Sequence, residues 1–254
     1  MRKGRKARLA APPVAKAVGP NMIGGRYQPL SAIEIEKVND AVMHVLEHIG
    51  MADPIPIVRE HALKRGCFMN EHDRLCYPRA LVEDVIASSP SGLQFKGQVP
   101  EFDLDLGGHG VNTYGGGEAV NMLDVGASKY RPSTLLDVYD VARLVDKMEN
   151  VHAFSRLVVA TEIEDQLACD LSIAYASAAG TAKHTALTFN DASHVQPTLE
   201  MLHLMAGGEK KWLDRPFAHG GGCSIISPLR YGEDNSEVCI ESVKFGAPVW
   251  IVTA

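Results

Sequence analysis

The sequence predicts an α/β protein, namely the N-terminal part of a (β/α)8 barrel preceded by a helical and β-hairpin region. After residue 131, strand-like runs alternate with helical segments. Successive strands begin about 30 residues apart, which is the size of one βαβ unit. Their cores are apolar rather than alternating, as in a parallel sheet that is covered on both faces. With 254 residues, 46% of them hydrophobic and 22% charged, the chain can bury a sizeable core.

Residues 1–30 form the first predicted region, a flexible basic extension. It carries several cations and no acid before Gly19: Arg2, Lys3, Arg5, Lys6, Arg8 and Lys16. A transit peptide or a nucleic-acid-binding arm are alternatives to a solvated tail. The formal net charge of -6 argues against nonspecific nucleic-acid binding by the folded body.

Residues 31–130 form the second predicted region, of helices and hairpins. Ser31 and Glu34 have capping-box spacing at the start of a helix that Gly50 ends. Its apolar face comprises Ile35, Val38, Val42, Val45 and Ile49. A second helix is expected over 78–90. The segment 94–130 alternates apolar and polar residues and breaks at glycines, which predicts antiparallel hairpins.

Residues 131–254 form the third predicted region, the first half of the barrel. Thr134 and Asp137 have capping-box spacing at the start of its first helix. Strands are expected over 153–161, 184–190, 217–226 and 248–254, with helices over 164–180, 193–208 and 233–246.

A complete barrel needs about 250 residues for eight units, and these residues supply about four. We therefore expect the N-terminal half of a longer protein, with a complete open sheet as the alternative. A half barrel would leave its edge strands unpaired and favour aggregation. It would also uncover an interior that we expect to contain Leu187, Phe189 and Ile251.

Two other features limit the class of protein to which this chain can belong. No apolar run approaches the roughly 20 residues that a membrane-spanning helix needs. The five cysteines are scattered and odd in number, which does not suit a disulfide framework or a paired zinc motif. We expect reduced thiols, a cytoplasmic location and no membrane or nucleic-acid partner.

The segment His44–His48 reads HVLEH and matches a zinc-protease pattern. In such a site the two histidines would bind zinc and Glu47 would act as the base. Both histidines lie off the apolar face of their helix, so we expect them to face solvent. We predict no metal site here.

Two glycine runs could be mistaken for phosphate cradles. Gly115–Gly117 and Gly220–Gly222 do not stand between a strand and a helix N-terminus, as a dinucleotide fingerprint requires. We expect a tight hairpin or a close backbone approach at the first run and room inside a barrel at the second. Cys223 and Ser224 then lie near the carboxyl end of a strand, where barrel enzymes place their sites.

Polar residues also follow the other strands. Thr161 and Glu162 follow the first strand, and Asn190 and Asp191 follow the second. Asp191 is an equally good helix cap. A nucleophilic pair of Cys223 with His219 is disfavoured, because four residues of extended chain separate them by about 13 Å.

Three long blocks resemble the trimethylamine methyltransferase family: PLSAIEIEKVNDAVMHVLEHIG, YRPSTLLDVYDVARLVDKMENV and FAHGGGCSIISPLRYGEDNSEVCIESVKFGAPVWIVTA. The chain looks most like the bacterial members that lack pyrrolysine. The resemblance implies a (β/α)8 barrel of roughly twice this length. It also implies methyl transfer from a tertiary or quaternary amine to the cobalt of a corrinoid, which a partner protein carries.

The substrate of such an enzyme is an alkylammonium ion, which aromatic faces and carboxylates bind well. The catalytic residues stay unassigned. The expected substrate-binding residues are Tyr114, Glu118, Glu162, Asn190, Asp191, Cys223 and Ser224. Two other functions remain open, a nicotinamide-dependent oxidoreductase and a non-catalytic alkylammonium-binding barrel protein. We expect a homo-oligomer when the protein is full length.

Overall fold

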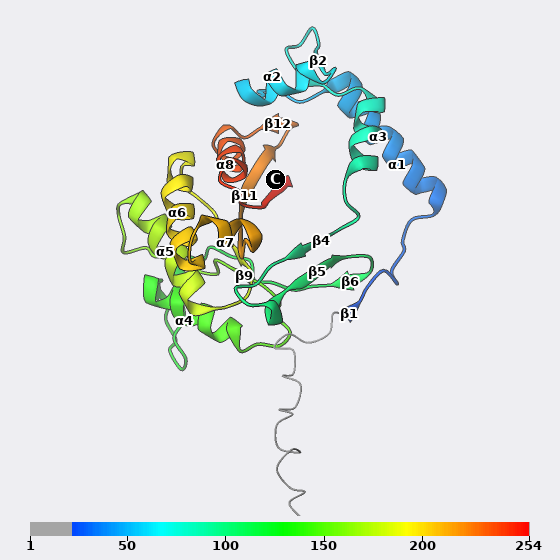
Figure 1. Cartoon of the computed structure of the whole chain (residues 1–254). Coiled ribbons are helices and arrows are strands. Elements are labelled where there is room, and N and C mark those ends of the chain that lie inside the picture. Colours follow the sequence, from blue (N-terminus) through cyan, green and yellow to red (C-terminus); the bar gives the residue numbers. More distant parts are fainter. Residues whose placement is uncertain (1–21, 254) are drawn as a thin grey trace, which may run out of the picture.

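The computed structural model describes residues 22–253. Figure 1 shows an arch of N-terminal helices above a sheet that helices flank on one side. The basic residues expected to form a flexible tail, Arg2 to Lys16, lie outside the described residues. Within the described range, no helix has both the length and the apolar character needed to cross a membrane.

Four parallel strands form the centre of the fold. They are β9 (Phe154–Ser155), β10 (Thr185–Ala186), β11 (Ala218–Ile226) and β13 (Val249–Thr253), and they neighbour one another in this order. The predicted series of parallel βα units is therefore confirmed, although regular pairing in β9 and β10 covers only two residues each. The described sheet is open, so the closed barrel stays a prediction.

Helices cover one face of this sheet. They are α4 (Leu135–Asp146), α5 (Gln166–Gly180), α6 (Val195–Ala206), α7 (Glu209–Asp214) and α8 (Glu233–Lys244), with a short η3 (Ala192–His194) before α6. The short helix α7 was not predicted. Gly207 ends α6 with a left-handed φ of 85°, as expected for a glycine cap.

The largest buried cluster lies between these helices and the strands. Leu187 is 4% exposed and packs with Leu199 and Leu202 of α6, and Phe189 packs against the same cluster. The expectation that these two side chains face the barrel interior is therefore wrong. Because side chains alternate along a strand, the interior side of β10 carries His184, Ala186 and Thr188 instead.

Ile251 is 63% exposed, as the incomplete sheet suggested, but it does not face the interior either. It lies opposite Gly222 in the register of β13 with β11. Its side chain lies on the side that α8 covers, at the edge of a groove described below.

The segment 113–119 runs beside β9 and extends the parallel series. Isolated parallel bridges join Tyr114 to Ala153 and Ala119 to Val158. At Gly117, an added Cβ would lie 2.7 Å from the carbonyl oxygen of Leu157. The expected close backbone approach at this glycine run is confirmed, and the parallel arrangement begins before residue 131.

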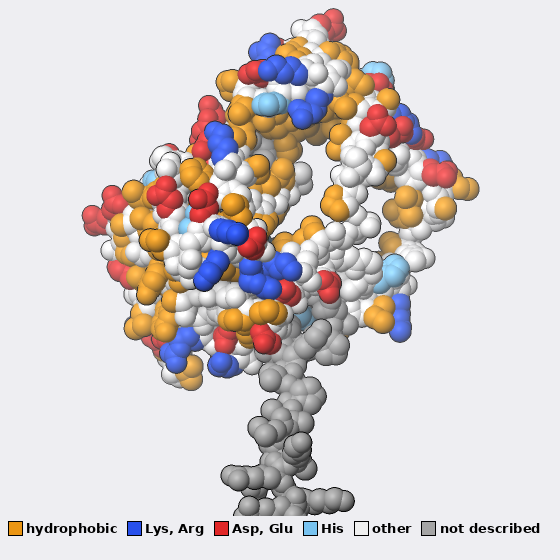
Figure 2. Space-filling view, viewed as in Figure 1, with side chains coloured by type: hydrophobic (Ala, Val, Ile, Leu, Met, Phe, Trp, Pro, Cys, Tyr) orange, Lys and Arg blue, Asp and Glu red, His pale blue; other side chains and the backbone are white. Residues whose placement is uncertain are grey.

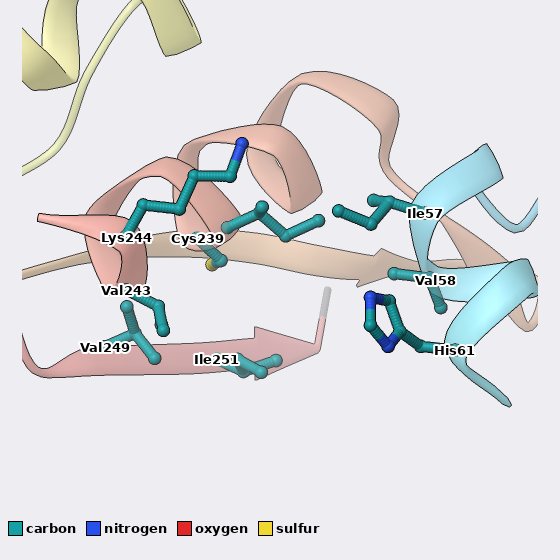
Figure 3. Close-up of a pocket in the computed structure, with 9 residues that line it drawn as sticks. Ile57, Val58, His61, Cys239, Val243, Lys244, Val249 and Ile251 are labelled. Carbon is teal, nitrogen blue, oxygen red and sulfur yellow. The ribbon is translucent and has the colours of Figure 1, made fainter. Parts of the chain in front are cut away.

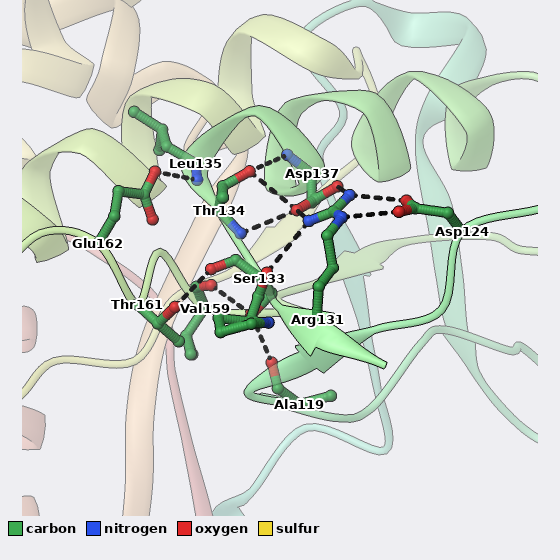
Figure 4. Close-up of polar contacts among 11 residues, drawn as sticks. Ala119, Asp124, Arg131, Ser133, Thr134, Leu135, Asp137, Val159, Thr161 and Glu162 are labelled. Atoms are coloured by element: carbon green, nitrogen blue, oxygen red, sulfur yellow. Dashed lines mark hydrogen bonds and ion pairs between the residues drawn. The ribbon is translucent and has the colours of Figure 1, made fainter. Parts of the chain in front are cut away.

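Helix α4 starts in a dense polar network (Figure 4). Thr134 and Asp137 form the predicted capping box. Arg131 donates to both oxygens of Asp137 at 2.7 Å and to those of Asp124 at 2.9 and 2.8 Å. The Arg131 guanidinium holds the pKa of the Asp137 carboxyl well below its usual range. This network fixes where the chain enters the helical layer.

The N-terminal arch contains α1 (Ala32–His44), the π-helical η1 (Val45–Ile49), α2 (Pro56–Lys64) and α3 (Arg79–Ser88). The capping box of Ser31 and Glu34 is confirmed. The predicted apolar face of α1 is exposed rather than buried, because no element of residues 22–253 covers it. Its exposed members are Ile35 at 56%, Val38 at 54%, Val42 at 48% and Ile49 at 44%.

Short antiparallel pairs support the arch and the lower edge of the sheet. The alternating pattern of residues 94–130 predicted those that involve this segment, whereas the pair between residues 68 and 76 was not predicted. The pairs are β2 (Phe68–Met69) with β3 (Leu75–Cys76), β4 (Gly92–Phe95) with β5 (Leu104–Gly107), and β7 (Asn121–Met122) with β8 (Arg131–Pro132). Strand β1 (Met22–Ile23) pairs with β6 (Gly110–Val111), and η2 (Pro100–Phe102) precedes β5.

The arch contacts the sheet at the tip of β11. There β12 (Arg230–Tyr231) folds back antiparallel onto the end of β11. Arg74 Nη2 donates to the Leu229 carbonyl at 3.0 Å, and Arg230 Nε donates to Asp53 Oδ2 at 2.8 Å. The hydroxyl groups of Tyr77 and Tyr231 are also in contact, and burial raises the pKa of Tyr77.

Candidate functional site

Several polar residues outside the hydrophobic core lie together at the carboxyl edge of the parallel sheet. Because β9 and β10 are parallel, the residues that follow them lie at one edge. Arg156 follows β9, and Thr188 and Asn190 follow β10. The neighbouring segment 113–119 brings Glu118 to the same edge.

Arg156 occupies the centre of this cluster. Its Nη2 lies 2.9 Å from Glu118 Oε1, and its Nη1 lies 3.9 Å from Asp170 Oδ1. The Arg156 side chain is 9% exposed, and that of Asp170 is fully buried. The Nε of Arg156 is buried without a hydrogen-bond partner in residues 22–253. Arg156 also lines a cavity of about 10 Å³. A cavity of that size has room for about one water molecule.

Asp170, on α5, is the most fully satisfied acid of the cluster. It accepts from the Asn190 backbone N–H at 2.8 Å, from Asn190 Nδ2 at 2.7 Å and from His194 Nδ1 at 2.8 Å. Asp170 thereby ties the chain after β10 to α5 and faces the Arg156 guanidinium.

Glu118 is the exposed carboxylate of the cluster. Its side chain is 42% exposed, and its backbone has a left-handed φ of 60°. Thr188 Oγ1 donates to Glu118 Oε1 at 2.6 Å, so this oxygen has one hydrogen-bond donor besides its ion pair with Arg156. With His194 neutral, two carboxylates and one guanidinium leave the cluster one negative charge, which favours a cationic ligand over an anionic one.

The glycine run of β11 makes room for neighbouring side chains rather than for a phosphate. A Cβ on Gly221 would lie 2.5 Å from Trp250 Cδ1, and a Cβ on Gly222 would lie 2.0 Å from Asn235 Oδ1. Gly221 therefore admits the indole of Trp250 on the interior side, and Gly222 faces α8. The run lies within β11 and not at a helix N-terminus, as the sequence predicted.

Two neutral histidines line the interior below this edge. His184 Nδ1 lies 2.7 Å from the Lys96 carbonyl oxygen, which only accepts, so Nδ1 carries the hydrogen. His184 Nε2 then accepts from His219 Nδ1 at 2.8 Å. Burial lowers the pKa of His184 to about 4 and that of His219 to about 3. Phe95 stacks on His184 with ring centroids 4.2 Å apart.

The structure brings together two of the residues predicted to bind substrate, Glu118 and Asn190. Glu162 Oε1 instead accepts from the Leu135 backbone N–H at 2.8 Å and supports the start of α4 (Figure 4). Asp191 caps η3 by accepting from the Ser193 backbone N–H, the alternative that the sequence left open.

The remaining predicted residues lie apart from the cluster. Tyr114 is 54% exposed beside Ala153. Cys223 is half-buried on β11. Ser224 is buried against α8, where its Oγ lies 3.2 Å from Cys239 Sγ.

Sequence reasoning missed four members of the cluster: Arg156, Asp170, Thr188 and His194. Two of them gave a usable signal. Arg156 interrupts the apolar strand-like run AFSRLVVA, and Asp170 interrupts the small and apolar helix QLACDLSIAYASAAG. A charged residue inside a buried segment needs a partner, so each predicts a polar contact.

The HVLEH motif takes a structural role. Glu47 Oε1 accepts from the Arg79 backbone N–H at 3.3 Å at the start of α3. His44 and His48 are exposed, as predicted, with ring centroids 4.6 Å apart. Among residues 22–253, no group of three or more His, Cys, Asp or Glu side chains is arranged to hold a metal ion.

A large apolar cavity lies away from the cluster, between α2, α8 and β13 (Figure 3). Its volume is about 480 Å³, and its lining is apolar apart from His61 and Lys244. No carboxylate lines it, so it lacks the charge that would select a cation. The carboxyl-edge cluster is therefore the better candidate for chemistry.

Comparisons with known proteins agree with the resemblance noted above. Residues 1–254 match the family model described as trimethylamine methyltransferase. The chain is 30% identical to the trimethylamine methyltransferase MttB of Desulfitobacterium hafniense DCB-2 over 217 residues, which cover 85% of the chain and 43% of that protein.

More distant relatives show the same partial coverage. The chain is 25% identical to the trimethylamine methyltransferase MttB1 of Methanosarcina mazei, over 87% of the chain and 45% of that protein. It is 21% identical to a glycine betaine methyltransferase of Desulfitobacterium hafniense Y51, over 82% of the chain and 43% of that protein. The chain thus spans less than half the length of the curated relatives it matches.

Proposed function

Because the chain belongs to the trimethylamine methyltransferase family, we propose that the whole protein transfers a methyl group from a tertiary or quaternary amine. The methyl acceptor in this proposal is the cobalt of a corrinoid that a partner protein carries. Relatives named for trimethylamine and for glycine betaine support the amine class and leave the individual amine open.

The observation that carries this proposal is the negatively charged cluster at the carboxyl edge of a parallel sheet. Enzymes built from parallel βα units place their sites at this edge. Glu118 offers a partly exposed carboxylate there, and the buried charges of Arg156 and Asp170 balance each other. An alkylammonium ion needs such a counter-charge.

Methyl transfer from an amine to cobalt requires little acid or base catalysis from the protein. A reduced corrinoid supplies the nucleophile when it is bound, so the protein contributes binding, orientation and electrostatics. The residues described above would hold the ammonium group and fix the direction of its methyl groups. We also propose that the parallel series from residue 113 to β13 continues into a (β/α)8 barrel in the whole protein.

The test uses the whole protein, reduced cobalamin and a panel of trimethylamine, tetramethylammonium and glycine betaine. We expect methylation of cobalamin with at least one of these amines. Tight amine binding without methylation would favour the alkylammonium-binding protein. Affinity for a nicotinamide dinucleotide without methylation would favour the oxidoreductase, and either result would overturn the proposal.

A further inference from the structure

Glu118 has one oxygen that the protein holds and one that it leaves open. Oε1 forms an ion pair with Arg156 Nη2 at 2.9 Å and accepts a hydrogen bond from Thr188 Oγ1 at 2.6 Å. Oε2 makes no hydrogen bond with any of residues 22–253. Two contacts, from the segments that follow β9 and β10, therefore fix the plane of the carboxylate, and they leave Oε2 available to a ligand.

Burial restricts the Arg156 side chain. Arg156 is 7% exposed, and its second nitrogen faces Asp170, which is 2% exposed. Asp170 in turn is held by both Asn190 and His194. The chain of contacts from α5 through Arg156 to Glu118 thus has little freedom to rotate away.

A purely structural role explains this arrangement less well. Apolar side chains of similar size often stabilise a core at least as well as a buried ion pair does. Arg156 nevertheless places a buried charge within reach of a half-exposed carboxylate. Such an arrangement orients Glu118 at an edge that solvent and ligands can reach.

We propose that Glu118 Oε2 is the counter-ion of the ammonium group and that Arg156 and Thr188 are positioning residues for it. This inference rests on the proposed function. The positive charge of an alkylammonium ion is spread over its methyl groups, so one oxygen can contact them without a hydrogen bond. Fixing that oxygen fixes which methyl group points away, toward the acceptor.

The experiment separates binding from transfer in the whole protein. Calorimetry measures the Kd of tetramethylammonium and of neopentyl alcohol, a neutral molecule of similar shape. We expect E118Q to raise the Kd of the cation about 10- to 100-fold, as loss of a charged contact does. The Kd of the alcohol should stay unchanged. The control E101Q alters an exposed glutamate of η2 and should leave both Kd values unchanged.

Substitutions of the positioning residues Thr188 and Arg156 should change kcat rather than the Kd of the cation. T188V and R156K keep the charge of the cluster but remove a donor or its fork geometry. We expect the Kd of the cation to change less than about 3-fold and kcat to fall about 10-fold, because orientation rather than attraction is lost. A general loss of folding would instead weaken binding of both ligands.

Several outcomes would overturn the inference. One is an E118Q protein that binds the cation like the wild type. Another is a T188V protein with unchanged kcat. This variant alone tests the positioning role if R156K fails to fold. A wild-type protein that binds tetramethylammonium through Glu118 but methylates no cobalamin would overturn the proposed function alone.

Discussion

At the scale of single residues, buried charged and titratable groups carry the most information about this fold. Lys183 is fully buried, and its Nζ donates to the carbonyl oxygens of Val145, Met148 and Val151 at 2.6 to 2.7 Å. Burial lowers its pKa. The ammonium group thus joins the Val145 carbonyl at the end of α4 to two carbonyl groups of the segment that follows the helix.

Replacing Lys183 should therefore destabilise the protein strongly. K183M keeps the length of the side chain but removes the donor that these three carbonyl groups share, and we expect a loss of about 2–4 kcal/mol in the free energy of unfolding. Urea denaturation measures it. K210M, at an exposed position of α7, should change stability by less than about 0.5 kcal/mol. A similar effect of the two substitutions would contradict this account.

The pair His184–His219 predicts how stability depends on pH. Their pKa values, about 4 and about 3, lie below the ordinary value of 6.5, so the unfolded chain binds protons more readily. The stabilisation is complete above about pH 6.5 and is lost as the pH falls toward 4. Urea denaturation at pH 7.5 and pH 5 should show this loss. H219Q should show a smaller loss, whereas H72Q, at an exposed turn, should behave like the wild type.

At the scale of elements, the glycines of β11 allow β13 to pack closely beside β11. Gly221 has a φ of +149°, and an added Cβ would lie 2.1 Å from the Trp250 carbonyl oxygen. Overpacking of this kind typically costs 1–3 kcal/mol or more. We expect G221A to fold poorly or unfold at clearly lower urea concentration. The matched substitution G116A meets nothing within 4 Å and should be tolerated, and equal stability of the two variants would refute the argument.

The sequence was enough to predict most helices and strands, whereas it did not predict which residues are buried or which way their side chains point. The capping boxes of α1 and α4, the parallel strands and the hairpins follow from local pattern. Leu187 was placed on the wrong side of β10 because an apolar run does not show which of its faces meets the helices. Glu118 and Asn190 could be chosen from their positions. Arg156 and Asp170 each signalled a polar contact, but its partner could not be predicted, because their contact joins segments that only the tertiary fold brings together.

At the scale of the whole molecule, the N-terminal arch and the sheet leave an opening between them (Figure 2). Hydrophobic side chains line parts of its rim, including the groove of about 480 Å³ between α2, α8 and β13. The apolar face of α1 is also exposed. Large apolar patches of this kind mark surfaces that another part of a protein or another copy covers.

We therefore expect the 254-residue chain to self-associate through its exposed apolar surfaces. V38E places a charge in the exposed face of α1, where Val38 is 54% exposed, and should shift the chain toward monomer without lowering its stability. N39E adds the same charge at the neighbouring exposed position and serves as the matched control. Size-exclusion chromatography with light scattering over a concentration series measures the difference. A wild-type chain that stays monomeric at every concentration would show that these surfaces need no cover, and an equal shift by both variants would assign the effect to net charge rather than to the apolar face.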